Sequence, residues 1–248
     1  MSKVMIVTGA SRGIGAATAL LAARQGYAVA VNFKSNRQAA DEVVRQIADE
    51  GGRALAVQAD MSSEADIVAL FETVDRELGP VNVLVNNAGI IDQTARVDEM
   101  SFERIDRMMR VNVTGPFICA REAIKRMSTR HGGQGGAIIN VSSAASHRGG
   151  ASEYVDYAAS KGAIDTFTEG LAKEVAGDGI RVNAVRPGVV KTEIHASGGN
   201  PDKPEKSSAS IPMGRAGEAF EIAHGILWLT SDEASFTTGA RLDIDGGV

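Results

Sequence analysis

The first 25 residues combine a short apolar run, a loop containing three glycines and an alanine-rich segment, in that order. Val4 to Val7 is β-branched and apolar, as buried parallel strands are. The loop Thr8 to Gly15 has the glycine spacing GxxxGxG, and Ala16 to Gln25 has a helical composition. Glycines at such a junction let a pyrophosphate approach backbone N–H groups at a helix N-terminus. The opening therefore predicts a nucleotide-binding strand–loop–helix unit, against the alternative of a plain strand-to-helix turn.

Apolar strands alternate with amphipathic helices along the rest of the chain. The expected strands cover residues 27–32, 54–58, 81–85, 137–141, 180–185 and 241–244. The expected helices cover residues 38–50, 62–78, 102–127, 151–176 and 219–229. This alternation predicts a Rossmann-like, doubly wound α/β fold with helices on both faces of a parallel sheet. Residues 1–248 suit a single domain, in which the polar segment 193–212 lacks apolar periodicity and is expected to form a lid or specificity loop.

Composition excludes several classes of function. The chain has 248 residues, a formal net charge of −5 and no basic arm or polybasic block, so we expect neither a nucleic-acid partner nor a membrane partner. No apolar run approaches the roughly 18 residues of a membrane span, and the start lacks the layout of a signal peptide. The single cysteine, Cys119, lies in an apolar stretch and is expected to be a core residue. We therefore expect a cytoplasmic protein.

The four histidines, at positions 131, 147, 195 and 224, show no metal-ligand spacing, so no metal site is expected. His195 and His147 are candidates for contact with a substrate, but the sequence assigns neither a role.

The end of the second expected strand bears on the choice of cofactor. An NAD-selective site usually has an acidic residue here that binds the ribose 2′-hydroxyl, and none is present before Asp41. Lys34 and Ser35 stand instead where a 2′-phosphate needs a cation and a donor, and Arg12 can assist from the glycine loop. We therefore expect NADP(H) in preference to NAD(H). The alternative is that Lys34 is a solvated loop charge.

Two further strand ends carry polar or small residues. Asp60 and Met61 follow the strand 54–58, where Asp60 can accept a hydrogen bond from an adenine amino group or cap the helix that begins near Ser62 or Ser63. The strand 81–85 ends in Asn86-Asn87-Ala88-Gly89, which lets a cofactor lie close and offers its ribose hydrogen-bond partners. Alone, this tetrapeptide would be typical of a turn.

Tyr157 and Lys161 lie four residues apart in the expected helix 151–176, so both side chains can reach one site. A phenol has a pKa of about 10, and a nearby cation lowers it toward the range useful for acid–base catalysis. The competing interpretation is a surface tyrosine and a solvated lysine. Asn112 lies near the middle of the expected helix 102–127, where a mediocre helix former suggests a function for its side chain. The many arginines of that helix are interpreted as a solvated or subunit-contact face.

Together these motifs resemble the short-chain dehydrogenase/reductase family, in particular its 3-oxoacyl-ACP reductase and glucose 1-dehydrogenase-like subgroup. The resemblance spans the chain and rests on residues 8–15, Asp60, residues 86–89, Asn112, Ser143, Tyr157, Lys161, Pro187, Gly188 and Thr192. It implies a sheet of about seven parallel strands and a homotetramer.

The resemblance also implies a role for each matched residue. Tyr157 would be the general acid/base, Lys161 would lower its pKa and hold the nicotinamide ribose, and Ser143 would bind the substrate oxygen. Ser142 is adjacent and stays an alternative to Ser143. Asn112 would hold a water that links Lys161 to solvent. The residues implied to bind the cofactor are Gly9, Ser11, Arg12, Gly13, Ile14, Gly15, Asn32, Lys34, Ser35, Asp60, Met61, Asn87, Ala88, Gly89, Tyr157, Lys161, Pro187, Gly188, Val190 and Thr192.

The expected activity is therefore an NADP(H)-dependent oxidoreductase that interconverts a carbonyl and a secondary alcohol on a small substrate. Two substrate classes compete: a 3-oxoacyl thioester, which suits the basic helix, and an aldose oxidised at C1, which suits the ending Val31-Asn-Phe-Lys-Ser35. A non-enzymatic nucleotide sensor or scaffold is the alternative from another class. It predicts losses among Asn112, Ser143, Tyr157 and Lys161, and all four are present.

Overall fold

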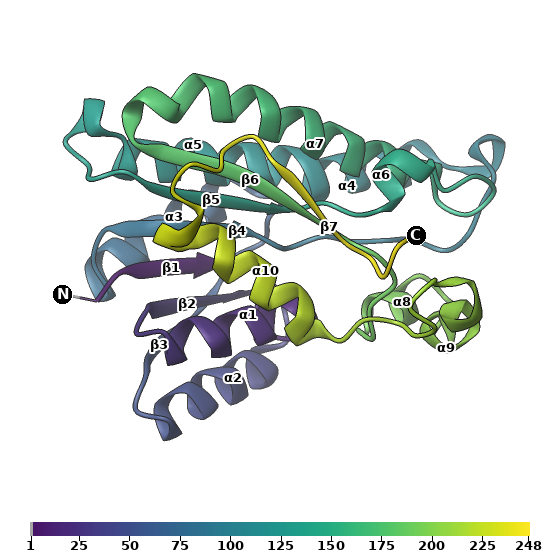
Figure 1. Ribbon diagram of the computed structural model, residues 1–248, viewed down its shortest axis with the longest axis horizontal. Coiled ribbons are helices and arrows are strands. Elements are labelled where there is room, and N and C mark those ends of the chain that lie inside the picture. Colours follow the sequence, from purple (N-terminus) through teal and green to yellow (C-terminus); the bar gives the residue numbers. More distant parts are fainter. Residues whose placement is uncertain (1) are drawn as a thin grey trace.

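Seven strands form one parallel sheet in the computed structural model, which describes residues 2–248 (Figure 1). The strands are β1 (Val4–Val7), β2 (Ala28–Phe33), β3 (Arg53–Gln58), β4 (Val81–Asn86), β5 (Gly136–Val141), β6 (Ile180–Pro187) and β7 (Arg241–Ile244). Their order across the sheet is β3-β2-β1-β4-β5-β6-β7. The chain therefore winds outward in both directions from the junction of β1 and β4, where doubly wound sheets bind ligands. The predicted Rossmann-like fold class is confirmed.

Helices cover both faces of the sheet (Figure 1). One face carries α1 (Gly13–Arg24), α2 (Arg37–Asp49) and α10 (Ala219–Thr230), and the other carries α3 (Glu64–Glu77), α5 (Gly115–Met127) and α7 (Val155–Val175). Strand β1 contributes side chains to the hydrophobic cores on both faces of the sheet. Val4 and Ile6 pack with α3, α5 and α7, whereas Met5 and Val7 pack with the other three helices, because successive strand residues face opposite sides.

Four shorter α-helices lie among the residues that the structure describes: α4 (Phe102–Met109), α6 (Ala145–Arg148), α8 (Ile194–Ser197) and α9 (Lys203–Ser207). Helices α8 and α9 belong to the segment 193–212 and project beyond the carboxyl ends of the strands (Figure 1). Within residues 2–248, no helix is both long and apolar enough to cross a bilayer. Cys119 is fully buried in the core, as expected.

The prediction of one continuous α-helix over residues 102–127 is wrong. This region is divided into α4 and α5 by a wider, π-helical turn over Arg110–Thr114. Asn112 lies in this turn, and its side-chain amide bonds both the N–H and the carbonyl of Ile90, at 2.8 and 2.9 Å. A π-helical turn accommodates one extra residue in a helix. This extra residue leaves the apolar pattern nearly unchanged, so the sequence did not reveal the turn.

The helix that carries Tyr157 begins later than expected. Its first residue is Val155 rather than Ala151, and residues 151–154 form turns. Gly150 and Ser152 both have φ of 59°, a left-handed value that a right-handed helix does not admit. Tyr157 therefore lies in the first turn of α7, directly beside the loop that follows β5.

Candidate active site

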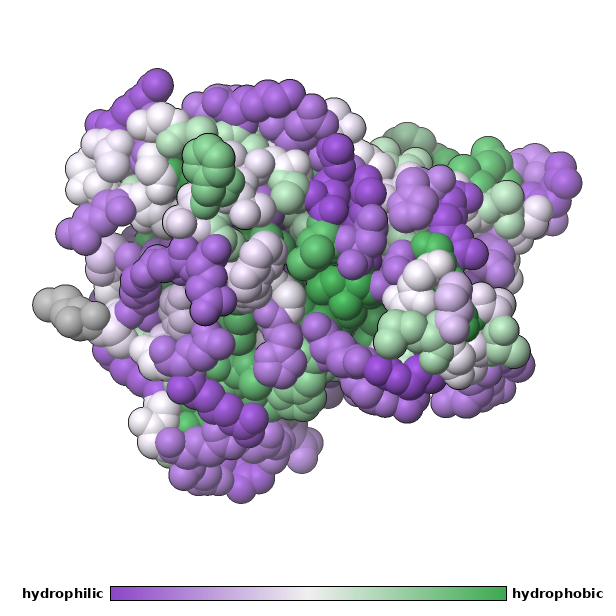
Figure 2. All heavy atoms as spheres, in the orientation of Figure 1, coloured by the Kyte–Doolittle hydropathy of each residue, from purple (hydrophilic) through white to green (hydrophobic). Residues whose placement is uncertain are grey.

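A cavity of about 880 Å³ lies at the carboxyl ends of the strands, where the sheet order reverses. The glycine loop and the ends of β2, β4, β5 and β6 form one side of it, and the segment 193–212 forms the other. Apolar atoms are visible in the hollow between the body of the molecule and the lobe that carries α8 and α9 (Figure 2). This is the position at which open α/β sheets bind their ligands.

The glycine loop contributes residues 9 and 11–14 to the cavity wall, and α1 begins there at Gly13. The positive end of the helix dipole therefore faces the cavity, which suits a pyrophosphate. Gly15 does not line the cavity. A β-carbon on it would lie 2.5 Å from both Asn87 Nδ2 and the carbonyl oxygen of Gly9, so this glycine permits close packing instead of contacting a ligand.

Asn32 differs from its expected role as a cofactor ligand. It is 1% exposed, and its Oδ1 accepts a hydrogen bond from the N–H of Gly9 at 3.0 Å. Its Nδ2 donates to the carbonyls of Val57 and Ala59, at 3.3 and 3.1 Å. Although Asn32 borders the cavity, its amide is fully engaged in fixing the glycine loop to β3.

Thr8 was missed by the sequence analysis as a site residue. Its Oγ1 accepts hydrogen bonds from the N–H groups of Asn87 and Ala88, at 3.0 and 2.9 Å. The side chain of Asn87 donates in turn to the carbonyl of Thr8 at 2.8 Å. These bonds tie the end of β4 to the end of β1, and only the pairing of the two strands brings the residues together.

Lys34, Ser35, Arg12 and Asp60 all border the cavity. Lys34 is not a free charge, because its Nζ lies 2.7 Å from Asp60 Oδ2. Burial raises the pKa of the Asp60 carboxyl, but hydrogen bonds from Lys34 and Ser62 outweigh it and lower that pKa. Of the two roles open to Asp60, the structure does not show the cap of the next helix, because Ser63 caps α3 by accepting from Asp66 N.

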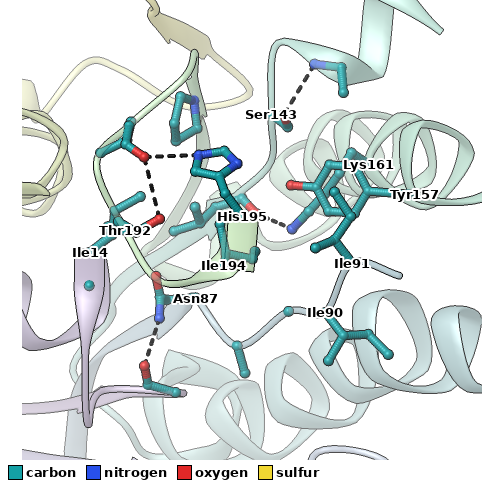
Figure 3. Close-up of a pocket in the computed structure, with 18 of the residues that line it drawn as sticks. Ile14, Asn87, Ile90, Ile91, Ser143, Tyr157, Lys161, Thr192, Ile194 and His195 are labelled. Carbon is teal, nitrogen blue, oxygen red and sulfur yellow. Dashed lines mark hydrogen bonds between the residues drawn. The ribbon is translucent and has the colours of Figure 1, made fainter. Parts of the chain in front are cut away.

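The remaining residues predicted to bind the cofactor also border the cavity. They are Met61, Asn87, Ala88, Gly89, Pro187, Gly188, Val190 and Thr192. Ile14, Asn87 and Thr192 lie around one end of the cavity in Figure 3, and Tyr157 and Lys161 lie around the other.

Ser143 and Tyr157 lie together at that second end. Ser143 follows β5, and its Oγ accepts a hydrogen bond from Ala145 N at 3.1 Å. Ser143 and Tyr157 both border the cavity, and the serine hydroxyl lies near enough to the phenol to lower its pKa. Ser142 is 2% exposed, and its hydroxyl donates to the carbonyl of Lys161 at 3.2 Å. The structure thus pairs Ser143, and not Ser142, with the tyrosine.

Burial changes the proton affinities of Tyr157 and Lys161 in opposite directions. It raises the pKa of the phenol, and the Ser143 hydroxyl only partly offsets it. It lowers the pKa of Lys161 to about 8, against the opposing charge of Asp165. The phenol pKa is therefore raised overall instead of lowered as expected, because desolvation is the largest effect on it. Lys161 Nζ donates to the carbonyl of Val141 at 2.7 Å and lies 5.7 Å from the centre of the tyrosine ring.

Asn112 lies behind the cavity wall. Besides its two bonds to Ile90, its Nδ2 donates to Ser160 Oγ at 3.1 Å. It thereby joins the segment after β4 to α7, one residue before Lys161. The structure shows this positioning function, and among residues 2–248 the Asn112 side chain makes no direct hydrogen bond to Lys161.

Arg104 was expected on a solvated or subunit-contact face, and the structure does not place it on a solvated one. Its side chain is 12% exposed, and its Nε donates to Asp156 Oδ2 at 2.8 Å. Asp156 Oδ1 in turn accepts from the N–H of Tyr157 at 2.9 Å. The pair attaches α4 to the first turn of α7 and so fixes the backbone that carries the tyrosine.

The segment 193–212 adds side chains to which the sequence gave no role. Lys203 pairs with Glu153 Oε2 at 2.7 Å and lies 4.3 Å from the ring centre of Tyr154. The Tyr154 ring meets that of Tyr157 edge-on, with the centres 6.0 Å apart. His195 Nε2 lies 2.9 Å from the carbonyl oxygen of Val190. Irregular loops leave no periodic signal, so only the tertiary structure could place these residues.

Known proteins provide an independent comparison. The sequence model of the family described as Enoyl-(Acyl carrier protein) reductase matches residues 9–248. The uncharacterized oxidoreductase YgfF of Escherichia coli is 54% identical over 98% of this chain and 99% of its own. Glucose 1-dehydrogenase 2 of Bacillus subtilis is 39% identical over 99% of this chain and 94% of its own.

Solved structures agree closely with the fold. A blue fluorescent protein from a metagenomic library, in complex with NADPH, superposes with a TM-score of 0.89 at 36% identity and covers 99% of this chain and 97% of its own. The 3-ketoacyl-(acyl-carrier-protein) reductase of Brucella melitensis, complexed with NADH, has a TM-score of 0.91 at 35% identity with the same coverage. With the fold, the motifs and these relatives in agreement, the chain belongs to the short-chain dehydrogenase/reductase family of oxidoreductases.

Proposed function

We propose that this protein is an NADP(H)-dependent oxidoreductase that interconverts a carbonyl and a secondary alcohol on a small substrate. The observation that carries the proposal is the grouping of Ser143, Tyr157 and Lys161 at one end of the cavity (Figure 3). A bound nicotinamide would supply or accept the hydride. The chain's own residues would manage the proton and the charge on the substrate oxygen.

In the reductive direction, the Tyr157 hydroxyl donates its proton to the carbonyl oxygen as the hydride reaches the carbonyl carbon. The raised pKa of Tyr157 keeps the phenol protonated at neutral pH, so it is ready to act as the acid. Ser143 binds the same oxygen and stabilises its developing negative charge. Lys161, whose pKa of about 8 leaves it mostly cationic at pH 7, stabilises the phenolate that results. In alcohol oxidation the proton returns to Tyr157.

The basic residues that border the cavity support NADP(H) as the preferred cofactor. Lys34 and Ser35 border the cavity and Arg12 adds a second cation, whereas β2 ends without an acidic residue. A 2′-phosphate would offer Lys34 a second anionic partner beside Asp60. The NADPH complex of the metagenomic protein is consistent with this choice, and the NADH complex of the Brucella reductase leaves NAD(H) as the second cofactor.

Asn112 would not contact the cofactor or the substrate. It would act by holding Ile90 and α7 in position.

Two substrate classes follow from the relatives. The Bacillus protein is named a glucose dehydrogenase and the Brucella protein a 3-ketoacyl reductase, so aldoses and 3-oxoacyl thioesters are the first compounds to test. The segment 193–212 would act as the lid that selects between them, since α8 and α9 border the cavity.

The test follows nicotinamide absorbance with NADPH and NADH against 3-oxoacyl thioesters, ketones, diketones, hydroxyketones, aldehydes and, in the oxidative direction, aldoses. Tyr157→Phe should reduce kcat by about a hundredfold to ten-thousandfold, the range that general acid–base catalysis contributes. Tyr27→Phe, far from the cavity, is the matched control and should keep full activity. Turnover that survives Tyr157→Phe would refute the catalytic assignment. Tight NADPH binding without turnover of any compound would favour the sensor alternative.

We also propose a homotetramer. Large aromatic side chains are exposed on α4, α5 and α10: Phe102 at 75%, Phe117 at 47% and Trp228 at 41%. Phe117 also stacks on Phe167 of α7, with ring centres 3.7 Å apart. Exposed aromatic side chains of this kind are common at subunit interfaces.

A further inference from the structure

The tautomer of His195 follows from its hydrogen bond. The ring lines the cavity from α8, and its Nε2 lies 2.9 Å from the carbonyl oxygen of Val190. A carbonyl oxygen can only accept a hydrogen bond, so Nε2 must carry a hydrogen. The imidazole is thereby anchored to the loop that follows β6, and its orientation is set by the main chain.

The other ring nitrogen is left as an acceptor. Burial lowers the pKa of His195, although the Val190 hydrogen bond and the charge of Glu205 oppose the change. The ring is therefore neutral at physiological pH, and Nδ1 carries a lone pair. Within residues 2–248, no side chain or backbone group bonds Nδ1. In Figure 3 this nitrogen is directed toward the side of the cavity where the Tyr157 hydroxyl lies.

The cavity thus presents two kinds of polar group to a small molecule. Tyr157 and Ser143 can each donate a hydrogen bond to a carbonyl oxygen, whereas the neutral His195 can only accept one at Nδ1. Apolar side chains of Ile91 and Ile194 line the cavity between them, and they suit a short carbon skeleton (Figure 3).

We infer that His195 is a specificity-determining residue that accepts a hydrogen bond from a hydroxyl group next to the reacting carbonyl. The preferred substrates are then hydroxyketones or hydroxyaldehydes and, in the oxidative direction, vicinal diols and sugars. A diketone or a 3-oxoacyl thioester has only hydrogen-bond acceptors near its reacting carbonyl. It therefore forms no hydrogen bond with Nδ1, and His195 does not favour its binding. This inference rests on the proposed function, because it requires Tyr157 to bind the reacting oxygen.

The experiment compares kcat/KM, with NADPH, for three four-carbon ketones: 3-hydroxy-2-butanone, 2-butanone and 2,3-butanedione. The quantity of interest is the ratio of hydroxyketone to 2-butanone in each variant. Intrinsic differences in carbonyl reactivity cancel when this ratio is compared between wild type and variant. His195→Phe should lower the ratio about tenfold, the value of one hydrogen bond at the upper end of its range. The ratio of diketone to 2-butanone should change less than about twofold, since no bond to Nδ1 is lost.

His195→Gln supplies the conservative variant. Its amide can donate to the Val190 carbonyl and still offer an oxygen to the substrate, so it should restore part of the ratio. His195→Ala is a second variant that removes Nδ1. It replaces His195→Phe in the comparison with wild type if the larger phenyl ring disturbs the fold. His147→Phe is the matched control, because His147 is exposed and does not border the cavity, and its ratios should equal those of wild type.

The outcomes separate the inference from the proposed function. Wild-type turnover with ratios that stay unchanged in His195→Phe and His195→Ala would overturn the inference and leave the proposed function intact. An equal fall in both ratios would also overturn it, because it would show a general disturbance of the cavity. A wild-type enzyme that oxidises NADPH with none of the three ketones would overturn the inference, and failure across the wider carbonyl and sugar panel would overturn the proposed function as well.

Discussion

Tyr157 and Lys161 show how desolvation competes with charge in one site. Lys161 is buried and Tyr157 is partly buried, and this burial disfavours the charged form of each. The result is a tyrosine that holds its proton and a lysine that releases its proton near pH 8. Asp165, four residues after Lys161 and 7% exposed, opposes the loss of that proton.

The pH dependence of ketone reduction should reflect Lys161. The folded pKa of about 8 lies below the ordinary value of 10.5, so the ammonium form, which stabilises the phenolate, is present below pH 8 and lost above it. We expect kcat/KM for reduction to fall as the pH rises through about 8. Asp165→Asn removes the charge that raises the pKa of Lys161, so it should move the fall to lower pH.

The control for this experiment is Asp178→Asn. Asp178 is an equally buried carboxylate at 6% exposure, but it pairs with Ser128 and Arg130 far from the cavity. Its profile should match that of wild type. A fall that remains at the same pH in Asp165→Asn would show that another group limits the reaction.

The π-helical turn before α5 depends on a close approach between main chains. A β-carbon on Gly115 would lie 2.4 Å from the carbonyl oxygen of Met61, and Met61 lines the cavity. Gly115→Ala should therefore push α5 away from the segment after β3. We expect a loss of about 1–3 kcal/mol in the free energy of unfolding, typical of overpacking, together with weaker NADPH binding.

Gly170→Ala is the matched control, since Gly170 lies inside α7 with no atom within 4 Å of the added carbon. It should stabilise the protein by about 0.5–1 kcal/mol, because alanine is the better helix former. Urea denaturation gives both unfolding free energies, and calorimetry gives the affinity for NADPH. Equal effects of the two substitutions would contradict the proposed role of the contact with Met61.

Lys203 connects the segment that carries α8 and α9 to the residues just before α7. This side chain is 17% exposed and contacts both Glu153 and the face of Tyr154. Lys203→Met removes the ion pair and the cation–π contact, so the segment should open more often. We expect KM for the carbonyl substrate to rise about threefold to tenfold, with a smaller change in kcat, because one such contact is worth about 1 kcal/mol.

Limited proteolysis provides a second measurement for the same variant, since the segment 193–212 should be cleaved faster in Lys203→Met. Lys206→Met, on the same helix but 68% exposed, is the control and should behave as wild type. An unchanged KM and an unchanged cleavage rate would show that Lys203 does not hold the segment.

The assembly of the whole molecule can be tested through its exposed aromatic side chains. Light scattering should give the mass of four chains of 25.9 kDa each. Phe117→Arg places a charge on the stacked pair with Phe167 and should reduce that mass, whereas Phe117→Tyr should not. A monomeric wild type would contradict the proposed tetramer.

Most of the fold could be predicted because its causes are local. Strands β1 and β4 are mainly apolar runs, and α2 begins at Arg37, directly after Asn36, whose side chain accepts a hydrogen bond from Ala39 N. The two errors arose where one residue changed the course of the chain. The extra residue in the turn Arg110–Thr114 and the left-handed backbone at Ser152 leave no trace in the apolar periodicity.

The order of motifs along the chain determined the family, the cofactor loop and the pairing of Tyr157 with Lys161. These depend on spacings of a few residues within one strand, loop or helix, which local sequence controls directly. The tertiary structure decided that Ser143 rather than Ser142 meets Tyr157, that Asn32 and Asn112 brace the backbone, and that His195 directs a lone pair into the cavity. Each of these depends on contacts between segments far apart in the chain, and only the packed fold brings the two partners within hydrogen-bond distance.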